Sequence, residues 1–345
     1  MGLPDLASST PRILGPTGRP ISSARPPART VRARYDAAES NAENAKLWAP
    51  ADGLSARAAN SPDVRTKLRN RARYEAANNG YASGMASTLA NDTIGTGPRL
   101  QVLSDDDDSN RAIADAFESW TAAVSLAEKL RTLRRARVVD GEGFALLTTN
   151  PRLPTPVQLD LSLIEADQVA TPDLWMHDTL AVDGIRFDAH GNPIEYHVLK
   201  EHPGETLRVT LGNAYDRVPA DLMLHWFRCD RPGQARGVPD ITPALPLYAL
   251  LRRYTLAVLA AAETAADFAA VLYSDLPADA EGLEGEPFET LEITRRMMTT
   301  LPAGWKMGQF QSDQPTTTYQ MFKREILSEI ARCLSMPYNV AAGDS

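Results

Sequence analysis

Residues 243–273 read PALPLYALLRRYTLAVLAAAETAADFAAVLY, and this stretch decides the fold. It predicts one continuous helix, about 45 Å long at 1.5 Å per residue. Its apolar residues recur at alternating steps of four and three, which is a heptad pattern. We call this stripe the seam: Leu247, Leu251, Tyr254, Val258, Ala261, Ala265, Phe268 and Leu272.

The other faces of this helix are also apolar or small, with Leu250, Leu256 and Leu259 among several alanines. A helix that is apolar nearly all round must be covered on several sides. Two interpretations stay open: a central core helix, or a helix packed against copies of itself in a ring. The candidate interface residues in the second case are Leu247, Leu251, Tyr254, Val258, Phe268 and Leu272.

Composition is that of a folded protein. The chain has 345 residues, of which 43% are apolar and 23% charged, so we expect roughly two to three domains. Two cysteines, Cys229 and Cys333, exclude a disulfide scaffold and a cysteine-rich zinc array, and they fit a reducing compartment. Charged residues interrupt the apolar stretch at 243–273, so we expect no membrane-spanning segment.

Charge is unevenly distributed along the chain. The net charge of −8 argues against a general nucleic-acid coat. Residues 1–99 carry 14 Lys+Arg against 8 Asp+Glu, whereas the remaining residues carry 22 against 36. Residues 1–34 are rich in Pro and Ser, and their six arginines face only Asp5. We therefore expect a largely disordered arm, either a mobile terminus or an interaction tail.

Helices are expected ahead of the strands. Residues 35–50 favour a first helix, and Ser61 followed by Pro62 favours the start of a second that runs to about Thr93. Residues 110–139 show helical spacing as well. The helix at 64–93 has a basic face that is a candidate for binding DNA or a partner, formed by Arg65, Lys67, Arg69, Arg71 and Arg73.

From Gly141 the pattern changes to strands. Residues 157–164 alternate with period two, and residues 184–188 and 194–199 flank a glycine-containing turn, as in a hairpin. Residues 144–149, 207–209 and 222–227 also favour strands. Helices followed by antiparallel strands indicate an α+β domain over 61–242.

An acidic excursion follows the long helix at 274–312, with strand-like pieces at 291–300 and 305–310. A second helix is then expected over 316–335 and is ended by Pro337. Its polar face is either an ordinary solvated surface or the lining of a channel. The channel-facing candidates are Gln320, Arg324, Ser328 and Arg332.

Motifs for catalysis are missing from the sequence. No G-x-S-x-G, GxxxxGK[ST] or dinucleotide fingerprint occurs, so we predict no enzyme and no cofactor. The run Asp105 to Asp108 lacks the ligand spacing and the glycine of a Ca²⁺ loop. His190 and His197 could approach across a hairpin, but no second ligand pair has zinc spacing, which favours ordinary histidines over a metal site.

Several strings in a fixed order resemble the lambda-type family of tailed-phage portal proteins. Each is weak alone, but together they span the chain from about residue 64 to its end. They are NNGY (78–81), NDTIGTGP (91–98), DGE (140–142), IEADQVATP (164–172), GIRFDAHGNP (184–193), VPADLMLH (218–225), RPGQARGV (231–238), LPAGW (301–305) and MPY (336–338).

This resemblance implies a portal-like α+β fold. Residues 1–60 would be the N-terminal arm with one helix, 61–242 the wing, 243–273 the first stem helix, 274–312 the clip, and 313–345 the second stem helix. Family members continue further, so the crown and tunnel loop are expected to be absent and the chain to be C-terminally truncated.

The resemblance also implies a function. The chain would be a subunit of a ring, commonly of twelve copies, at the capsid vertex through which double-stranded DNA is packaged and ejected. Its partners would be terminase, head-completion, capsid and scaffold proteins, with no membrane, in the virion and, during assembly, the host cytoplasm. The alternatives are a decayed prophage remnant and a nucleic-acid-binding module without a working channel.

Overall fold

The computed structural model describes residues 45–171, 181–205, 215–267, 271–274, 305–308 and 316–344. The chain divides into two compact units, Met1–Gly53 and Leu54–Ser345. In the first unit, residues 45–50 form turns where the sequence favoured a helix, and residues 1–44 of the predicted arm lie outside the described residues.

The predicted helix at 64–93 is two helices rather than one. After the short α1 (Ala56–Ala59), α2 runs over Pro62–Asn78 and α3 over Gly80–Ile94. Asn79 between them is extended, and its side-chain oxygen accepts hydrogen bonds from the backbone N–H of Tyr81 and Ala82. Asn79 caps the N-terminus of α3, and this cap starts a new helix even though the apolar spacing continues across it.

The helical block at 110–139 is divided in the same way, into α4 (Asp107–Ala123) and α5 (Leu126–Val139). The break is at Ser125, which adopts a left-handed conformation with φ of 52°. The acidic run is used structurally, because the side chain of Asp106 accepts from the backbone N–H of Asp108 and caps α4.

Two antiparallel sheets follow, and most of the predicted strands are present. One has the order β2-β1-β7 and the other the order β3-β4-β5-β6. The strand β6 was not foreseen, and the strand expected at 207–209 lies outside the described residues. The bounds are β1 Glu142–Thr149, β2 Leu159–Ile164, β3 Ala181–Val182, β4 Ile185–Phe187, β5 Pro193–Leu199, β6 Tyr215–Pro219 and β7 Met223–Phe227, with a 3-10 turn at Ala220–Leu222.

The central strand β1 is covered on both faces. Phe144 belongs to a buried cluster with residues of the second sheet, such as Ile185 and Tyr196, whereas Ala145 belongs to a cluster with Leu133 of α5. Successive side chains of a strand point to opposite faces, so β1 joins α5 on one side to the second sheet on the other. This explains why β1 is apolar without alternation.

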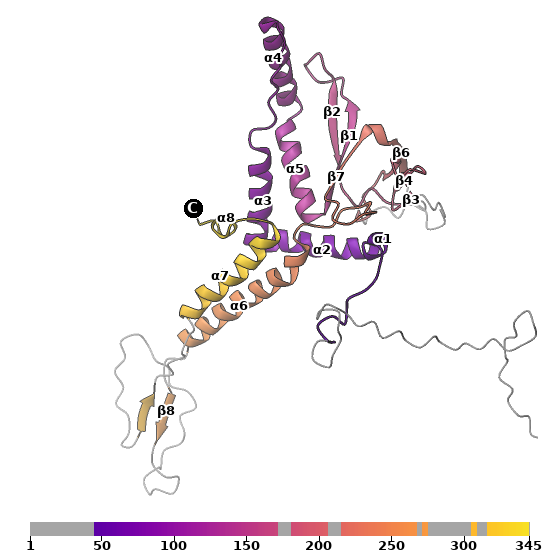
Figure 1. The fold of residues 1–345 in the computed structure, drawn as a ribbon. Coiled ribbons are helices and arrows are strands. Elements are labelled where there is room, and N and C mark those ends of the chain that lie inside the picture. The colour runs from indigo at the N-terminus through magenta and orange to yellow at the C-terminus, as the bar shows by residue number, and fades with distance from the viewer. Residues whose placement is uncertain are drawn as a thin grey trace, which may run out of the picture. The chain divides into compact units, whose positions relative to one another are not determined.

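The largest core is helical. It combines α2, α3 and the end of α5 with the start of α6 (Leu245–Asp267), α7 (Thr316–Cys333) and α8 (Tyr338–Ala342). A 3-10 turn at Thr242–Ala244 leads into α6. Figure 1 shows α6 and α7 running side by side away from this core. The predicted second helix at 316–335 is thus confirmed almost to the residue.

The first long helix ends earlier than expected. Helix α6 is described to Asp267, and residues 271–274 form the strand β8, which pairs with β9 (Trp305–Gly308) in an antiparallel hairpin. The valine and tyrosine of β8 favour a strand once a partner is available, so heptad spacing over-extended the helix. The strand at 305–310 is confirmed, while the one predicted at 291–300 lies outside the described residues.

Helix α6 is apolar enough to meet the criteria for a membrane-spanning helix, which we did not expect. Thr242–Glu263 has the length and mean hydropathy, 1.2, of a membrane-spanning helix, and 22% of that window is buried. Composition alone therefore does not exclude a span, contrary to our expectation. Such a helix also occurs in assemblies, where apolar surface is covered by other subunits.

The close approach of two loops gives a first prediction. Gly141 has φ of +92°, and a Cβ there would lie 2.6 Å from the carbonyl carbon of Val238; Gly191 has φ of +88° with open space around it. We expect Gly141→Ala to lower the free energy of unfolding by about 3 kcal/mol, through steric overlap added to the backbone cost. Gly191→Ala, the matched control, should cost only about 1 kcal/mol. Equal losses in urea unfolding would contradict the assignment.

Candidate functional site

The seam of α6 packs against its own chain. Leu251 is 2% exposed and lies with Leu247 in the helical core. The Tyr254 ring is 4.6 Å from that of Phe322 and 5.7 Å from that of Tyr319, both on α7. Leu251 is therefore covered by its own chain. Leu247 and Tyr254 are half-buried beside the core and α7, and their contact with a second copy stays a prediction.

The remaining seam candidates are less well placed. Val258 is half-buried. Phe268 lies outside the described residues, and Leu272 lies in β8 rather than on the helix.

Three large apolar side chains of α6 are exposed, and all three lie outside the seam. Leu250, Leu256 and Leu259 are 52%, 62% and 54% exposed. At 3.6 residues per turn, Leu250 and Leu259 lie half a turn apart, one on each side of the seam. The exposed apolar surface of α6 is thus two flanks rather than one stripe.

A groove adjoins the second flank. Its volume is about 400 Å³, and it lies between α3, α6 and α8. Leu256, Thr255, Tyr81, Gly84 and Val340 line it. The two flanks of α6 therefore differ in shape, since the groove opens beside Leu256.

The polar face predicted on α7 is largely present. Gln320, Arg324 and Arg332 are exposed, whereas Ser328 is half-buried and donates its hydroxyl to the carbonyl oxygen of Arg324 at 2.8 Å. The Arg324 guanidinium lies 5.0 Å from the centre of the Tyr338 ring. Glu325 and Glu329 are exposed on the same helix, so its solvated surface carries both signs of charge.

The basic face predicted on α2 is only partly available. Arg65 and Arg69 are 4% and 3% exposed and form ion pairs with Asp183 and with Glu142 and Asp167, respectively. Burial, together with the neighbouring Arg236, lowers the pKa of Arg65 to about 9.

Arg73 is half-buried and pairs with Asp140 and Asp167. Lys67 and Arg71 are exposed. Three of the five predicted binding residues are thus engaged inside the protein. Residues four apart share one face of a helix, so Arg65, Arg69 and Arg73 point inward, whereas Lys67 and Arg71, each two residues further on, lie on the opposite face.

A buried charge network lies where α2, β1 and the loop before α6 meet. Glu142 is fully buried and accepts from Arg236 Nη2 at 2.7 Å, Arg236 Nε at 2.9 Å and the backbone N–H of Gly237 at 2.9 Å. Arg236 in turn donates to the carbonyl oxygens of Val169 and Ala166. This carboxylate and guanidinium bind each other through two hydrogen bonds and are satisfied by backbone groups, as a buried pair requires.

His225 completes the network from β7. Its Nε2 is 3.1 Å from Glu142 Oε2, and its ring stacks on Phe144 with centroids 4.2 Å apart. Burial lowers the pKa of His225 and outweighs the attraction of Glu142, so the ring is neutral at pH 7. Burial alone would raise the pKa of Glu142, but Arg236 and His225 hold it below its ordinary value.

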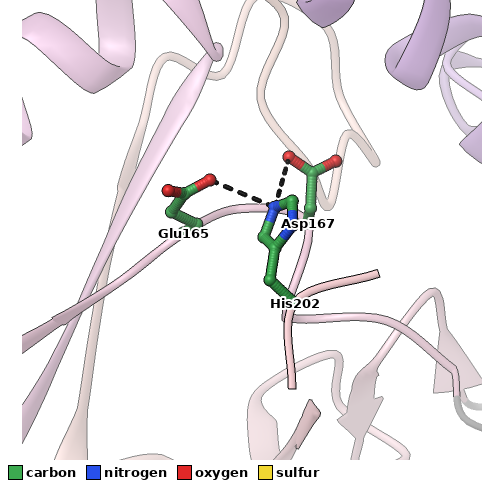
Figure 2. A group of neighbouring side chains, drawn as sticks. All are labelled: Glu165, Asp167 and His202. Carbon is green, nitrogen blue, oxygen red and sulfur yellow. Dashed lines mark ion pairs between the residues drawn. The ribbon is translucent and has the colours of Figure 1, made fainter. Parts of the chain in front are cut away.

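Figure 2 shows Glu165, Asp167 and His202, the described group whose ligand atoms could surround a metal ion. His202 Nδ1 accepts from the backbone N–H of Gly204 at 3.0 Å. A neutral imidazole then carries its proton on Nε2, which lies 3.1 Å from Glu165 and 3.6 Å from Asp167. Since Nε2 presents N–H rather than a lone pair, and arginines already pair with Asp167, these residues do not fit a metal.

The histidine pair considered for zinc is not assembled either. His197 is buried and pairs with Glu195 at 2.9 Å, while His190 lies exposed in the turn after β4. Within the described residues, the histidines thus serve packing and ion pairing.

Comparison with known proteins identifies the family. "Phage portal protein, lambda family" matches residues 42–345. The chain belongs to this family. Portal proteins are structural components of the virion. The resemblance read from the sequence motifs is thereby confirmed.

A curated relative agrees with this assignment. A probable portal protein of Halomonas phage phiHAP-1 is 26% identical over 300 residues, which is 80% of this chain and 58% of that protein. This chain thus spans somewhat more than half of the relative's length.

The solved structures show the fold. The neck of an empty gene transfer agent particle matches with a TM-score of 0.51 at 16% identity, over 86% of this chain and 74% of that one. The virion of a native gene transfer agent particle matches with a TM-score of 0.50 at 15% identity, over 85% and 73%. The α+β portal fold is therefore confirmed.

The buried pair yields a second prediction. We expect Glu142→Gln to lower the free energy of unfolding by about 3 to 5 kcal/mol, because the buried Arg236 would lose its bidentate counter-ion and be left with Asp183, which also pairs with Arg65. Glu165→Gln is the matched control: Glu165 is exposed and pairs with Arg73, so its loss should cost less than about 1 kcal/mol. A Glu142 variant as stable as the control in thermal unfolding would contradict this account.

The same carboxylate predicts a dependence on pH. Because the folded pKa of Glu142 lies below its ordinary value of 4.5, the folded state binds fewer protons than the unfolded state near that pH. The stabilisation is complete above about pH 4.5 and is lost as the pH falls below it. In urea unfolding between pH 7 and 3, wild type should lose more stability than Glu142→Gln; parallel curves would contradict the prediction.

Proposed function

We propose that this chain is a subunit of the portal ring at the capsid vertex, through which double-stranded DNA is packaged and later ejected. The observation that carries the proposal is the pair of uncovered flanks on α6, Leu250 on one side and Leu256 with Leu259 on the other. Two different apolar surfaces on one helix suit a head-to-tail contact, in which each copy offers one flank to each neighbour.

Closed rings follow from such contacts when the rotation between copies closes. We propose twelve copies, as is common in the family. In this assembly, terminase and head-completion proteins dock on the segment at 274–312, and the ring also contacts capsid and scaffold proteins. The ring forms in the host cytoplasm and remains in the virion.

The face of α7 suits the lining of a channel. DNA must slide, so the lining should not hold phosphates strongly, because each neutralised phosphate adds salt-dependent affinity. Arg324 and Arg332 are accompanied on α7 by Glu325 and Glu329, which keeps the net charge low. We propose Gln320, Arg324, Ser328 and Arg332 as the residues that face the passing duplex.

A nucleic-acid-binding module without a channel is less well supported. It would need an exposed basic face on α2, and Arg65 and Arg69 are buried in ion pairs there. A decayed prophage remnant has no specific observation in its favour.

The two-flank interface predicts an unusual pattern of complementation. Leu250→Asp and the double variant Leu256→Asp/Leu259→Asp should each be monomeric, since every junction would contain one damaged flank. Mixed together, they retain one intact junction and should form one-to-one dimers but nothing larger. Native mass spectrometry measures this, with Leu222→Asp, an exposed leucine next to β7, as the control that still assembles. Larger rings in the mixture would overturn the head-to-tail assignment.

The channel lining predicts an effect of added charge. Gln320→Lys/Ser328→Lys should bind duplex DNA more tightly than wild type in assembled rings, with a steeper dependence on salt, because two further phosphates would be neutralised. Asn339→Lys on α8 is the control. We expect the first variant to slow DNA packaging and the control to leave it unchanged; the reverse order would exclude α7 as the lining.

A further inference from the structure

Helix α4 is the least covered long helix among the described residues, since none of its residues is buried. Its sequence is nevertheless amphipathic. Phe117 and Trp120 lie on one side with their rings 5.7 Å apart, and Trp120 donates its indole N–H to the carbonyl oxygen of Leu159. The inner end of the apolar stripe is thus packed on β2, whereas its outer end is open: Ile113 is 49% exposed and Leu103, just before the helix, is 86% exposed.

The same end of α4 is strongly acidic. Residues 105–118 contain six carboxylates and a single base, Arg111. Arg111 pairs with Asp108, at 3.6 Å. Hydrogen bonds from the Ser109 side chain and from backbone N–H groups lower the pKa of Asp106, so this carboxylate stays ionised at neutral pH.

A groove runs along α4 beside the acids. Its volume is about 740 Å³, and it is enclosed by α4, the start of α5 and the segment at 96–100. Apolar side chains of Leu100, Phe117 and Leu126 line it together with Asp115 and Glu118. Two bases, Arg99 and Arg131, also line it, and Arg131 donates to the carbonyl oxygen of Gly95.

A groove that combines apolar side chains with carboxylates, beside an acidic helix end, fits an occupant that is basic and carries apolar side chains. The chain contains such a segment ahead of its first helix. Residues 12–34 hold six arginines and no acid, interspersed with Ile13, Leu14 and Ile21. Fully extended, 34 residues can span about 110 Å.

We propose that the arginine-rich segment at 12–34 of one copy docks along α4 of a neighbouring copy. This rests on the proposed ring, and it adds a second kind of contact to it. Beyond residue 99 each copy has a balance of 22 basic against 36 acidic residues, so copies brought together repel one another. A basic arm laid on the neighbour's acidic helix offsets that repulsion where the copies meet.

Photocrosslinking of the full chain tests the proposal. Ile113→p-benzoylphenylalanine is made in protein labelled with ¹⁵N and mixed with unlabelled wild type before irradiation. We expect adducts that join the labelled α4 peptide to an unlabelled peptide from residues 12–34. Tyr74→p-benzoylphenylalanine, at an exposed position of α2, is the matched control and should give none.

Charge reversal then separates docking from chance proximity. Arg12→Glu/Arg19→Glu/Arg25→Glu should lower the adduct yield by about tenfold, since each surface ion pair contributes a factor of roughly 1.5 to 5. Combining it with Asp105→Arg/Asp115→Arg/Glu118→Arg should restore the yield. These are exposed positions, and unchanged circular dichroism checks that each variant folds.

The outcomes distinguish this inference from the ring itself, because the oligomeric state of each sample is measured separately. Rings that form without arm adducts overturn the inference and leave the proposed function standing. Adducts confined to a single copy, or adducts that charge reversal leaves unchanged, also overturn it. Inter-copy adducts that follow the charge swap support it whether or not complete rings are present.

Discussion

The bidentate pair of Glu142 and Arg236 is the interaction on which the arrangement of the wing depends. It joins the first residue of β1 to the loop that leads into α6, and through Arg69 it also holds α2. Removing two such charges from water is costly, and the cost is offset only where every remaining hydrogen-bonding group finds a partner. Gly237 matters for the same reason, since its backbone N–H donates to Glu142 and its lack of a side chain lets the loop approach Gly141.

Helix α6 shows how a pattern can be identified correctly and its role misassigned. The four-three spacing selected a true buried stripe, but periodicity does not say which partner covers it. Here Tyr254 packs against α7 of the same chain. The leucines outside the heptad pattern, Leu250, Leu256 and Leu259, remain exposed and available to other molecules. The sequence did mark those leucines, as apolar residues on faces that an ordinary surface helix would keep polar.

The strands and the second long helix could be predicted because alternation and capping are local signals. The breaks at Asn79 and Ser125 could not, since spacing continues across them and only their side-chain or backbone geometry reveals the stop. The charge network was also missed, although DGE and RPGQARGV were both noted as motifs. A charged residue beside glycine gives no hint of its partner 94 residues away.

That separation along the chain has a consequence for synthesis on the ribosome. Glu142 emerges 94 residues before Arg236, and at roughly 5 to 20 residues per second the interval is about 5 to 20 s. Until Arg236 has been synthesised, Glu142 lacks its main buried partner, so docking α2 on β1 would be only weakly favourable. We infer that the wing closes late and as one unit, and that nascent chains present Phe144 and the surrounding apolar residues to chaperones during the wait.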